Sequence, residues 1–231
     1  MTKVLDHGYI RHVESWGRGD AGVPEAGIIE AARQSTQGSF RGWAQDAKLL
    51  AYLFNSKPQH ATPFEFAGMV IEVQAPILVF REWQRHRTQS YNEMSARYSP
   101  LPDLNYIPSV ERLMGDAGST NRQAQALTGT MPMTVERAEW FRAKLARTYA
   151  EAEDTYQQAL AEGVAKELAR CCIPVGRYSR MRASTSLRNW CAFLTLRNDP
   201  KAQWEIRQYA AALADIMRAE FPQVMQLFDA R

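Results

Sequence analysis

Six arginines lie between Leu168 and Asn198, in a stretch that contains no aspartate, glutamate or lysine. They are Arg170, Arg177, Arg180, Arg182, Arg188 and Arg197. A guanidinium group binds phosphate or carboxylate through two parallel hydrogen bonds, which a lysine ammonium cannot do. The stretch therefore indicates a site for an anionic ligand. The alternative is that several of these arginines pair with acids elsewhere in the chain, such as Glu151 and Glu153.

A second group of polar residues lies between positions 81 and 97. Its basic members, Arg85, His86 and Arg87, stand at the end of a predicted helix, where one or two of them would stabilise the helix dipole. That role does not account for the hydrogen-bonding side chains that come next. These are Asn92, Glu93, Ser95 and Arg97. So many polar groups in a short segment favour the binding of a polar ligand.

The cysteines and histidines do not indicate a thiol nucleophile or a metal site. The chain has three cysteines, Cys171, Cys172 and Cys191, and an odd number with an adjacent pair suits a reducing compartment better than a disulfide framework. Cys171 and Cys172 lie in an apolar helix end, which favours burial over nucleophilic chemistry. The histidines are scattered, so no spacing typical of a zinc site is present.

The composition is that of an ordinary globular protein, with 45% hydrophobic and 23% charged residues over 231 positions. A net charge of +3 is too small to indicate nucleic-acid binding by itself. No segment approaches the roughly 18 apolar residues needed to cross a bilayer. The first twenty residues lack the apolar core of a secretory signal. We therefore expect a cytoplasmic protein that has neither a nucleic-acid nor a membrane partner.

Helices and strands that would position these residues alternate along the chain, which predicts a single α/β domain. Strand-like patterns cover 3–16, 66–74 and 177–186, and helical patterns cover 24–33, 43–54, 77–87, 134–162, 187–196 and 201–221. The polar, proline-containing segment 88–108 is expected to be extended and irregular.

Several separated elements resemble the flavin-dependent thymidylate synthases (the ThyX family). Arg85-His86-Arg87, followed after seven residues by Ser95, matches the RHR-x7-S signature of that family, and the likeness continues to Tyr98. Upstream, His60-Ala61-Thr62-Pro63-Phe64-Glu65 resembles its H-x-T-P-F-E element. Ala169-Arg170, Leu196-Arg197 and 202–206 also look like family positions. Together these elements span roughly residues 25–215.

The resemblance implies a fold and an activity. The fold would be α/β (α+β), an antiparallel sheet flanked by long helices, with residues 1–231 forming one domain of a homotetramer whose active sites lie between subunits. The enzyme would convert dUMP to dTMP, with 5,10-methylenetetrahydrofolate as carbon donor. FAD reduced by NADPH would supply the hydride, and no cysteine nucleophile would be needed.

The resemblance also assigns residues. Arg197 matches the catalytic arginine that pairs with the uracil ring, where a fixed cation would favour the anionic form of the ring; the alternative is a cap at a helix end. The positions implied for dUMP are Glu82, Trp83, Gln84, Arg85, Glu93, Met94, Ser95, Ala96, Arg97 and Arg170, with Arg97 as phosphate ligand. Those implied for FAD are Ser35, Thr62, Arg85, His86, Arg87, Thr88, Glu93, Ser186, Arg188, Ala192 and Lys201. No metal is implied.

The sequence departs from the family pattern at several of these positions. Ser186, Ala192 and Lys201 stand where many members have Asn, Asn and His, and Glu82 stands where Gln is frequent. Lys201 keeps a hydrogen-bond donor, whereas Ala192 offers none from its side chain. These differences leave room for a related flavin-dependent enzyme with another pyrimidine or carbon donor. A second alternative, an arginine-rich nucleic-acid-binding module, is disfavoured because Glu82 and Glu93 would repel a continuous phosphate backbone.

Overall fold

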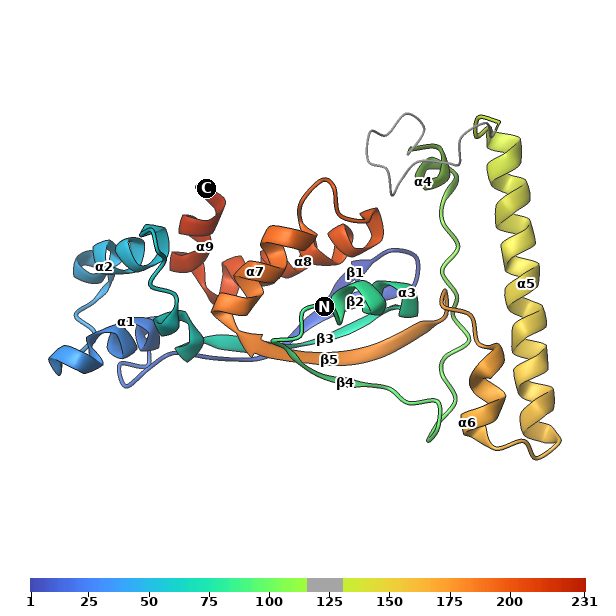
Figure 1. Ribbon diagram of the computed structural model, residues 1–231, viewed down its shortest axis with the longest axis horizontal. Helices are drawn as coiled ribbons and strands as arrows, with labels where there is room; N and C mark the ends of the chain where they lie inside the picture. Colours follow the sequence, from blue (N-terminus) through green and yellow to red (C-terminus); the bar gives the residue numbers. More distant parts are fainter. Residues whose placement is uncertain (116–130) are drawn as a thin grey trace.

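The computed structural model describes residues 1–115 and 131–231, and its centre is a five-stranded sheet (Figure 1). The strand order is β1-β2-β3-β5-β4, and every neighbouring pair is antiparallel. The strands are β1 (Thr2–Val4), β2 (Gly8–Trp16), β3 (Gly68–Pro76), β4 (Ser90–Glu93) and β5 (Tyr178–Ser186). The expected antiparallel sheet with flanking helices is confirmed.

The two central strands give the sheet one apolar face and one polar face. Their register pairs Ile71 with Ala183, and the apolar side chains that the two strands direct toward this inner face are buried. The next pair along, Glu72 with Arg182, points to the opposite face, because successive side chains of a strand alternate. The alternation fixes the register, since a slip by one residue would bury the charged pair.

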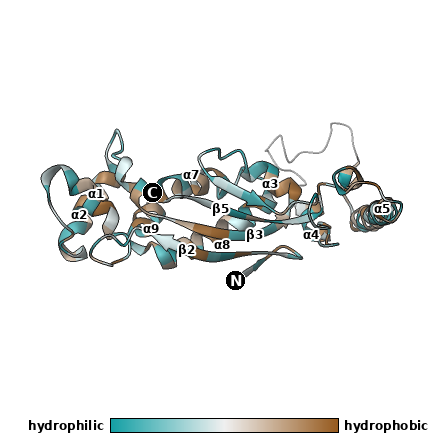
Figure 2. Ribbon diagram, turned by 90° about the horizontal axis from the view of Figure 1, so that it is seen from below, coloured by the Kyte–Doolittle hydropathy of each residue, from teal (hydrophilic) through white to brown (hydrophobic). Residues whose placement is uncertain are grey.

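Helices cover the apolar face of the sheet, and further helices lie beyond its two ends (Figure 1). The face is covered by α3 (Ile77–Trp83), α7 (Leu187–Arg197) and α8 (Trp204–Glu220). One end carries α1 (Ala26–Arg33), α2 (Trp43–Asn55) and α9 (Pro222–Asp229), and the other carries α4 (Val110–Gly115), α5 (Val135–Ala161) and α6 (Lys166–Ala169). Figure 2 shows α5 end-on, at the opposite extreme of the molecule from α1 and α2. Short 3-10 turns cover Gln34–Thr36, Thr62–Phe66 and Arg170–Cys172.

An aromatic cluster fixes α3 and α7 against the sheet. The ring centroids of Trp83 and Phe193 lie 4.5 Å apart, and both side chains are fully buried. Trp190 donates a hydrogen bond from Nε1 to the carbonyl of Met69 in β3, at 3.2 Å. Burial of each such ring stabilises the fold by about 1.5–3 kcal/mol. The C-terminal ends of α3 and α7 are therefore held in fixed positions relative to each other.

Most predicted elements agree with the structure, and the differences are these. Segment 3–16 forms two strands, joined by a turn that contains Leu5 in a left-handed conformation. The helix predicted for 77–87 ends at Trp83, because Tyr91 hydrogen-bonds the carbonyls of Trp83 and His86 and holds the following residues in a turn. Segment 88–108 is not irregular throughout, since Ser90–Glu93 pairs with β5 as an edge strand. Helices α4 and α9 were not predicted.

Within residues 1–115 and 131–231, no helix combines the length and the apolar character that a membrane crossing requires. The same residues contain no group of three or more His, Cys, Asp or Glu side chains that could hold a metal ion.

Candidate active site

Arg197 lies at the last turn of α7, and its guanidinium reaches the end of α3. Nη1 donates to the Glu82 carboxylate at 2.6 Å, and Nη2 donates to the Glu82 carbonyl at 3.0 Å. Nε donates to Nε2 of His86 at 2.9 Å. Arg197 thus contacts a carbonyl of another helix and not those of its own. Because all three nitrogens are anchored, the plane of the guanidinium is fixed, and its remaining N–H groups can donate to a ligand.

His86 is a neutral hydrogen-bond acceptor in this arrangement. Burial, and then the charge of Arg197, lower its pKa to about 4, although Glu82 acts in the opposite direction. Since Nε2 accepts from Arg197, the ring proton is on Nδ1. The ring also packs against Phe193, with a centroid separation of 4.8 Å. His86 therefore orients Arg197 through Nε2 and has only Nδ1–H to offer a flavin.

Hydrogen bonds from buried side chains fix the turn between α3 and β4. Trp83 donates from Nε1 to Oε1 of Gln89 at 3.1 Å, and the Tyr91 hydroxyl hydrogen-bonds the His86 carbonyl at 2.8 Å. Burial raises the pKa of Tyr91 to about 12, so the hydroxyl stays protonated and available as a donor. Gln84 donates to the Glu93 carboxylate at 3.2 Å. These contacts bring Glu82, Gln84, Glu93 and Arg197, all implied as nucleotide contacts, to one end of α3.

A second group of cations surrounds Glu167 of α6. Arg97 pairs with the Glu167 carboxylate at 3.4 Å, and Arg170 donates to its carbonyl at 3.3 Å. Lys166 donates to the carbonyl of Tyr98 at 3.1 Å. The side chains of Arg97 and Glu167 are both more than half exposed, so this ion pair is weak and can be exchanged for another anion. This group has the chemistry of a phosphate site.

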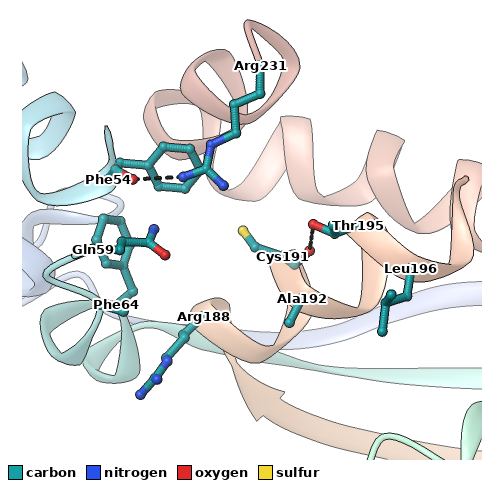
Figure 3. A pocket seen from close by; sticks show the side chains of 10 residues that line it. Phe54, Gln59, Phe64, Arg188, Cys191, Ala192, Thr195, Leu196 and Arg231 are labelled. Carbon is teal, nitrogen blue, oxygen red and sulfur yellow. Dashed lines mark hydrogen bonds between the residues drawn. The ribbon is translucent and has the colours of Figure 1, made fainter. Parts of the chain in front are cut away.

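A cavity of about 340 Å³ lies between the 3-10 turn at Thr62–Phe66 and α7 (Figure 3). It is lined by Phe54, Gln59, Ala61, Phe64, Arg188, Cys191, Ala192, Thr195, Leu196 and Arg231. Two cations, two aromatic rings and no acid are among these residues, which suits a planar ligand with negative charge. Burial raises the pKa of Cys191 to about 12, so its thiol is not a nucleophile at neutral pH.

The residues implied for FAD are spread over the cavity and its surroundings. Arg188 and Ala192 line the cavity, and Arg188 pairs with Glu65. The hydroxyl oxygen of Ser186 is buried and has no hydrogen-bond partner among the described residues. Ser186 immediately precedes α7, which lines the cavity, and an orphaned donor at this position fits a flavin dinucleotide, which carries acceptors along its ring edge and pyrophosphate.

Most of the other implied residues are exposed to solvent. Ser35 is exposed in the turn Gln34–Thr36, and Thr62, Arg85 and Arg87 are exposed. Lys201 is exposed too, and its backbone N–H donates to Asp199 at 2.7 Å. The side chain of Trp83 is fully buried, so only its backbone can face a nucleotide.

The remaining implied positions contribute mainly backbone or local contacts. The Thr88 carbonyl accepts from Thr185 at 3.0 Å, and Met94 N–H donates to the Arg180 carbonyl at 2.7 Å. Ser95 Oγ accepts from the N–H of Arg97 at 3.3 Å. Ala96 is buried. These contacts shape the loop that carries Arg97.

Some residues of these groups were not identified from the sequence. Glu167 could have been identified as a neighbour of Arg170, because a spacing of three residues places two side chains one turn apart on a helix. Phe64 lies in the H-x-T-P-F-E element, which was the available signal. Phe54, Gln59 and Arg231 could not have been found, because they come from separate segments that meet only in the fold. Arg177, which the sequence placed in the arginine-rich stretch, pairs with Glu153 in the interior, as the alternative interpretation held.

Comparison with known proteins identifies relatives of this chain. The family model described as thymidylate synthase complementing protein matches residues 21–223. A flavin-dependent thymidylate synthase of Thermus thermophilus is 37% identical over 226 residues, covering 98% of this chain and 77% of the relative. The enzyme of the same name from Thermotoga neapolitana is 34% identical over 225 residues, covering 97% of this chain and 92% of the relative.

The fold is also similar to a solved structure of the UMP/dUMP methylase PolB from Streptomyces cacaoi, bound with 5-Br dUMP. The TM-score is 0.81 at 28% identity, and the match covers 99% of this chain and 97% of that one. The PolB structure bound with 5-Br UMP matches with a TM-score of 0.79 at 27% identity, covering 99% and 96%. Family model, curated relatives and fold agree over nearly the whole chain, which therefore belongs to the flavin-dependent thymidylate synthase family of methyltransferases.

Proposed function

We propose that this protein converts dUMP to dTMP, with 5,10-methylenetetrahydrofolate as carbon donor and with FAD that NADPH reduces. The observation that carries the proposal is the anchored guanidinium of Arg197, which is held by Glu82 and His86 with N–H groups left to donate. Membership in the family and the 5-Br dUMP bound to PolB support a uracil nucleotide as substrate. FAD, when bound, would supply the hydride.

Arg197 is the proposed catalytic residue. Its guanidinium would donate hydrogen bonds to a carbonyl of the uracil ring and stabilise negative charge that develops there, without reorganisation during the reaction. Glu82, Gln84 and Glu93 would line the same nucleotide, since contacts at the end of α3 bring them together. Arg97 and Arg170 would bind its phosphate as exposed guanidinium groups.

The cavity beside α7 is the proposed flavin site. Arg188 would bind the pyrophosphate or the ring edge, Ser186 would hydrogen-bond the flavin, and Phe54 and Phe64 would exclude water. Ser35, Thr62, Arg85, His86, Arg87, Thr88 and Lys201 are further proposed contacts.

We also propose that residues 1–231 form one domain and that the active site is completed between subunits of a homotetramer. Arg197 and its partners lie at the end of α7, whereas Arg97 and Arg170 gather at α6, which is well separated from α7 in Figure 1. Within the described part of the chain, no hydrogen bond or ion pair links the two groups. A nucleotide has its base and its phosphate at opposite ends, so groups from two chains could hold one dUMP.

The proposal is tested with the purified protein. It should carry or take up FAD, oxidise NADPH faster when dUMP is added, and form dTMP only with methylenetetrahydrofolate. A protein that cannot be reconstituted with FAD would contradict it. Sedimentation would test the homotetramer.

A second candidate substrate is UMP, because PolB is described as a UMP/dUMP methylase and was solved with 5-Br UMP as well as 5-Br dUMP. The product assay therefore includes UMP in parallel with dUMP. The nucleic-acid-binding alternative is disfavoured further, because the buried Arg177 and the paired Arg197 do not form a continuous cationic surface.

A further inference from the structure

Arg231 brings a guanidinium to the cavity that the proposed function assigns to the flavin. It follows α9 and is exposed, and it lines the cavity together with Arg188 of α7. Figure 3 shows the two arginines on opposite sides of the cavity. The family model matches residues 21–223, so Arg231 lies outside the part of the chain that the family pattern covers.

Two contacts with Phe54 of α2 hold this guanidinium in place. Nη2 donates to the Phe54 carbonyl at 2.7 Å, and the central carbon lies 3.9 Å from the centre of the Phe54 ring. The ring is buried, so it gives the cation a rigid surface on which to stack. The N–H groups on Nη1 and Nε have no acceptor among residues 1–115 and 131–231 and can donate to a ligand.

Helix α9 is fixed at its first turn, so it brings Arg231 to a defined place. The Glu25 carboxylate accepts from the N–H of Gln223 at 2.9 Å and from the N–H of Val224 at 2.7 Å. Glu25 is almost fully buried, and the side chain of Val224 is buried as well. A ligand that reaches the cavity therefore meets a guanidinium whose position does not depend on that ligand.

The two cations of the cavity differ in how far acids neutralise them. Arg188 pairs with Glu65 at the surface, whereas no Asp or Glu side chain in the described part of the chain pairs with Arg231. Burial raises the pKa of the Cys191 thiol to about 12, and Arg231 acts in the opposite direction while Glu25 adds to the effect of burial. Since Cys191 lines the cavity, the positive charge of Arg231 reaches the cavity wall.

A guanidinium without an acid partner, beside an aromatic wall, suits the phosphate groups of a cofactor. We infer that Arg231 binds the pyrophosphate of FAD, and that it makes the site select a flavin dinucleotide over a flavin without phosphate. The inference rests on the proposed function. Arg231 would donate from Nη1 and Nε to phosphate oxygens, while Phe54 holds its other edge. Hydrogen bonds between two ionised groups are roughly twice as strong as those between neutral groups.

The test compares FAD with riboflavin, which has the same ring system and no phosphate. The full chain is stripped of bound flavin, and dissociation constants of both flavins are measured by flavin fluorescence at low salt. Nucleotide, folate and NADPH are left out. The ratio of the two constants isolates what the phosphate groups contribute to binding.

Arg231→Ala should raise the dissociation constant of FAD roughly five- to thirtyfold. The constant of riboflavin should change by less than about twofold, because the lost contact is to phosphate. R231K should lie between R231A and the wild type, since a lysine keeps the charge but loses the planar fork and the stacking on Phe54.

The matched control is R218A. Arg218 of α8 pairs with Asp229 of α9 at 2.8 Å, so its loss removes a contact that holds α9 without changing the cavity. Its FAD constant should stay within about twofold of the wild type, as expected for an exposed ion pair.

NADPH also carries a pyrophosphate, so its KM is measured in R231A at saturating FAD. We expect this KM to stay at the wild-type value. A higher KM for NADPH with an unchanged FAD constant would assign Arg231 to the other dinucleotide and overturn the inference.

Three further results would overturn the inference while leaving the proposed function intact. They are an FAD constant that R231A does not change, an equal rise for riboflavin and FAD, and an equal rise in R218A and R231A. If the wild type binds neither flavin, the proposed function itself fails, and the inference fails with it. Thermal melting of each variant shows that it is folded.

Discussion

Arg177 and Arg197 come from the same arginine-rich stretch, yet they differ in what surrounds them. Arg177 is 1% exposed and pairs with Glu153 and Asp103, with a further bond to the carbonyl of Pro102. Arg197 is 16% exposed and pairs with Glu82, which is itself partly open to solvent. A guanidinium that is closed in on all sides stabilises the fold, whereas one anchored on one side can still bind a ligand. The comparison shows that the exposure of the guanidinium itself, 1% for Arg177 against 16% for Arg197, separates the two roles.

The largest effect should come from Arg197→Ala. If Arg197 stabilises charge on the uracil ring, the rate of dTMP formation should fall by about 10²–10³-fold, the usual effect of removing such a donor. The melting temperature should change little, since the side chain is anchored at the edge of the core. Single-turnover product formation and thermal denaturation measure the two quantities. Unchanged turnover would remove Arg197 from the mechanism.

Arg177→Met should have the opposite profile. Removing the buried partner of Glu153 should lower the free energy of unfolding by about 3 kcal/mol. Nucleotide affinity per folded molecule should not change, because Arg177 is far from solvent. Denaturant titration measures the loss. The matched control is R182M: Arg182 is 57% exposed and 3.6 Å from Glu72, so its loss should cost less than about 1 kcal/mol. Equal losses in both variants would contradict the comparison.

A smaller effect is expected from pH acting on His86. Burial and Arg197 lower its pKa from 6.5 to about 4, so between these values the unfolded chain binds more protons than the folded one. Stability contributed by neutral His86 is therefore lost as the pH falls from about 6.5 toward 4. Melting temperatures of the wild type and His86→Gln, measured from pH 7.5 to 4.5, should converge in acid. A constant difference would show that His86 does not titrate in this way.

The smallest effect should come from Glu167→Gln. Both members of the Arg97–Glu167 pair are more than half exposed, so the free energy of unfolding should change by less than about 0.5 kcal/mol. Because the carboxylate would compete with a phosphate for Arg97, the variant should bind dUMP a few-fold more tightly, roughly two- to fivefold. Isothermal titration at low salt measures the affinity. Weaker binding would show that Glu167 orients Arg97 instead of competing for it.

Much of the fold could be predicted from the sequence, because periodic apolar residues place β3, β5, α5 and α8. The edge strand β4 could not, because Ser-Tyr-Asn-Glu has little apolar alternation and is held by backbone pairing with β5. The end of α3 at Trp83 depends on the Tyr91 hydroxyl, eight residues away, which no local pattern reports.

The candidate site was predictable in its residue types but not in its geometry. The arginine-rich stretch indicated anion binding, yet the sequence could not separate Arg177, which Glu153 neutralises inside the fold, from Arg197. It also could not place Glu82 beside Arg197, because 115 positions separate them. Phe54 and Arg231, whose guanidinium lies 3.9 Å from the centre of the Phe54 ring, meet only when α9 packs beside α2.

The position of Trp140 on α5 gives the molecule a built-in optical reporter. Its indole is 65% exposed on the helix that lies at one end of the molecule, whereas the indoles of Trp83 and Trp190 are fully buried. Contact with another chain at α5 would shield that indole from water. Its emission would then move to shorter wavelength, and it would become less accessible to a dissolved quencher as the protein concentration rises. The fluorescence of the enclosed indoles would not follow the concentration.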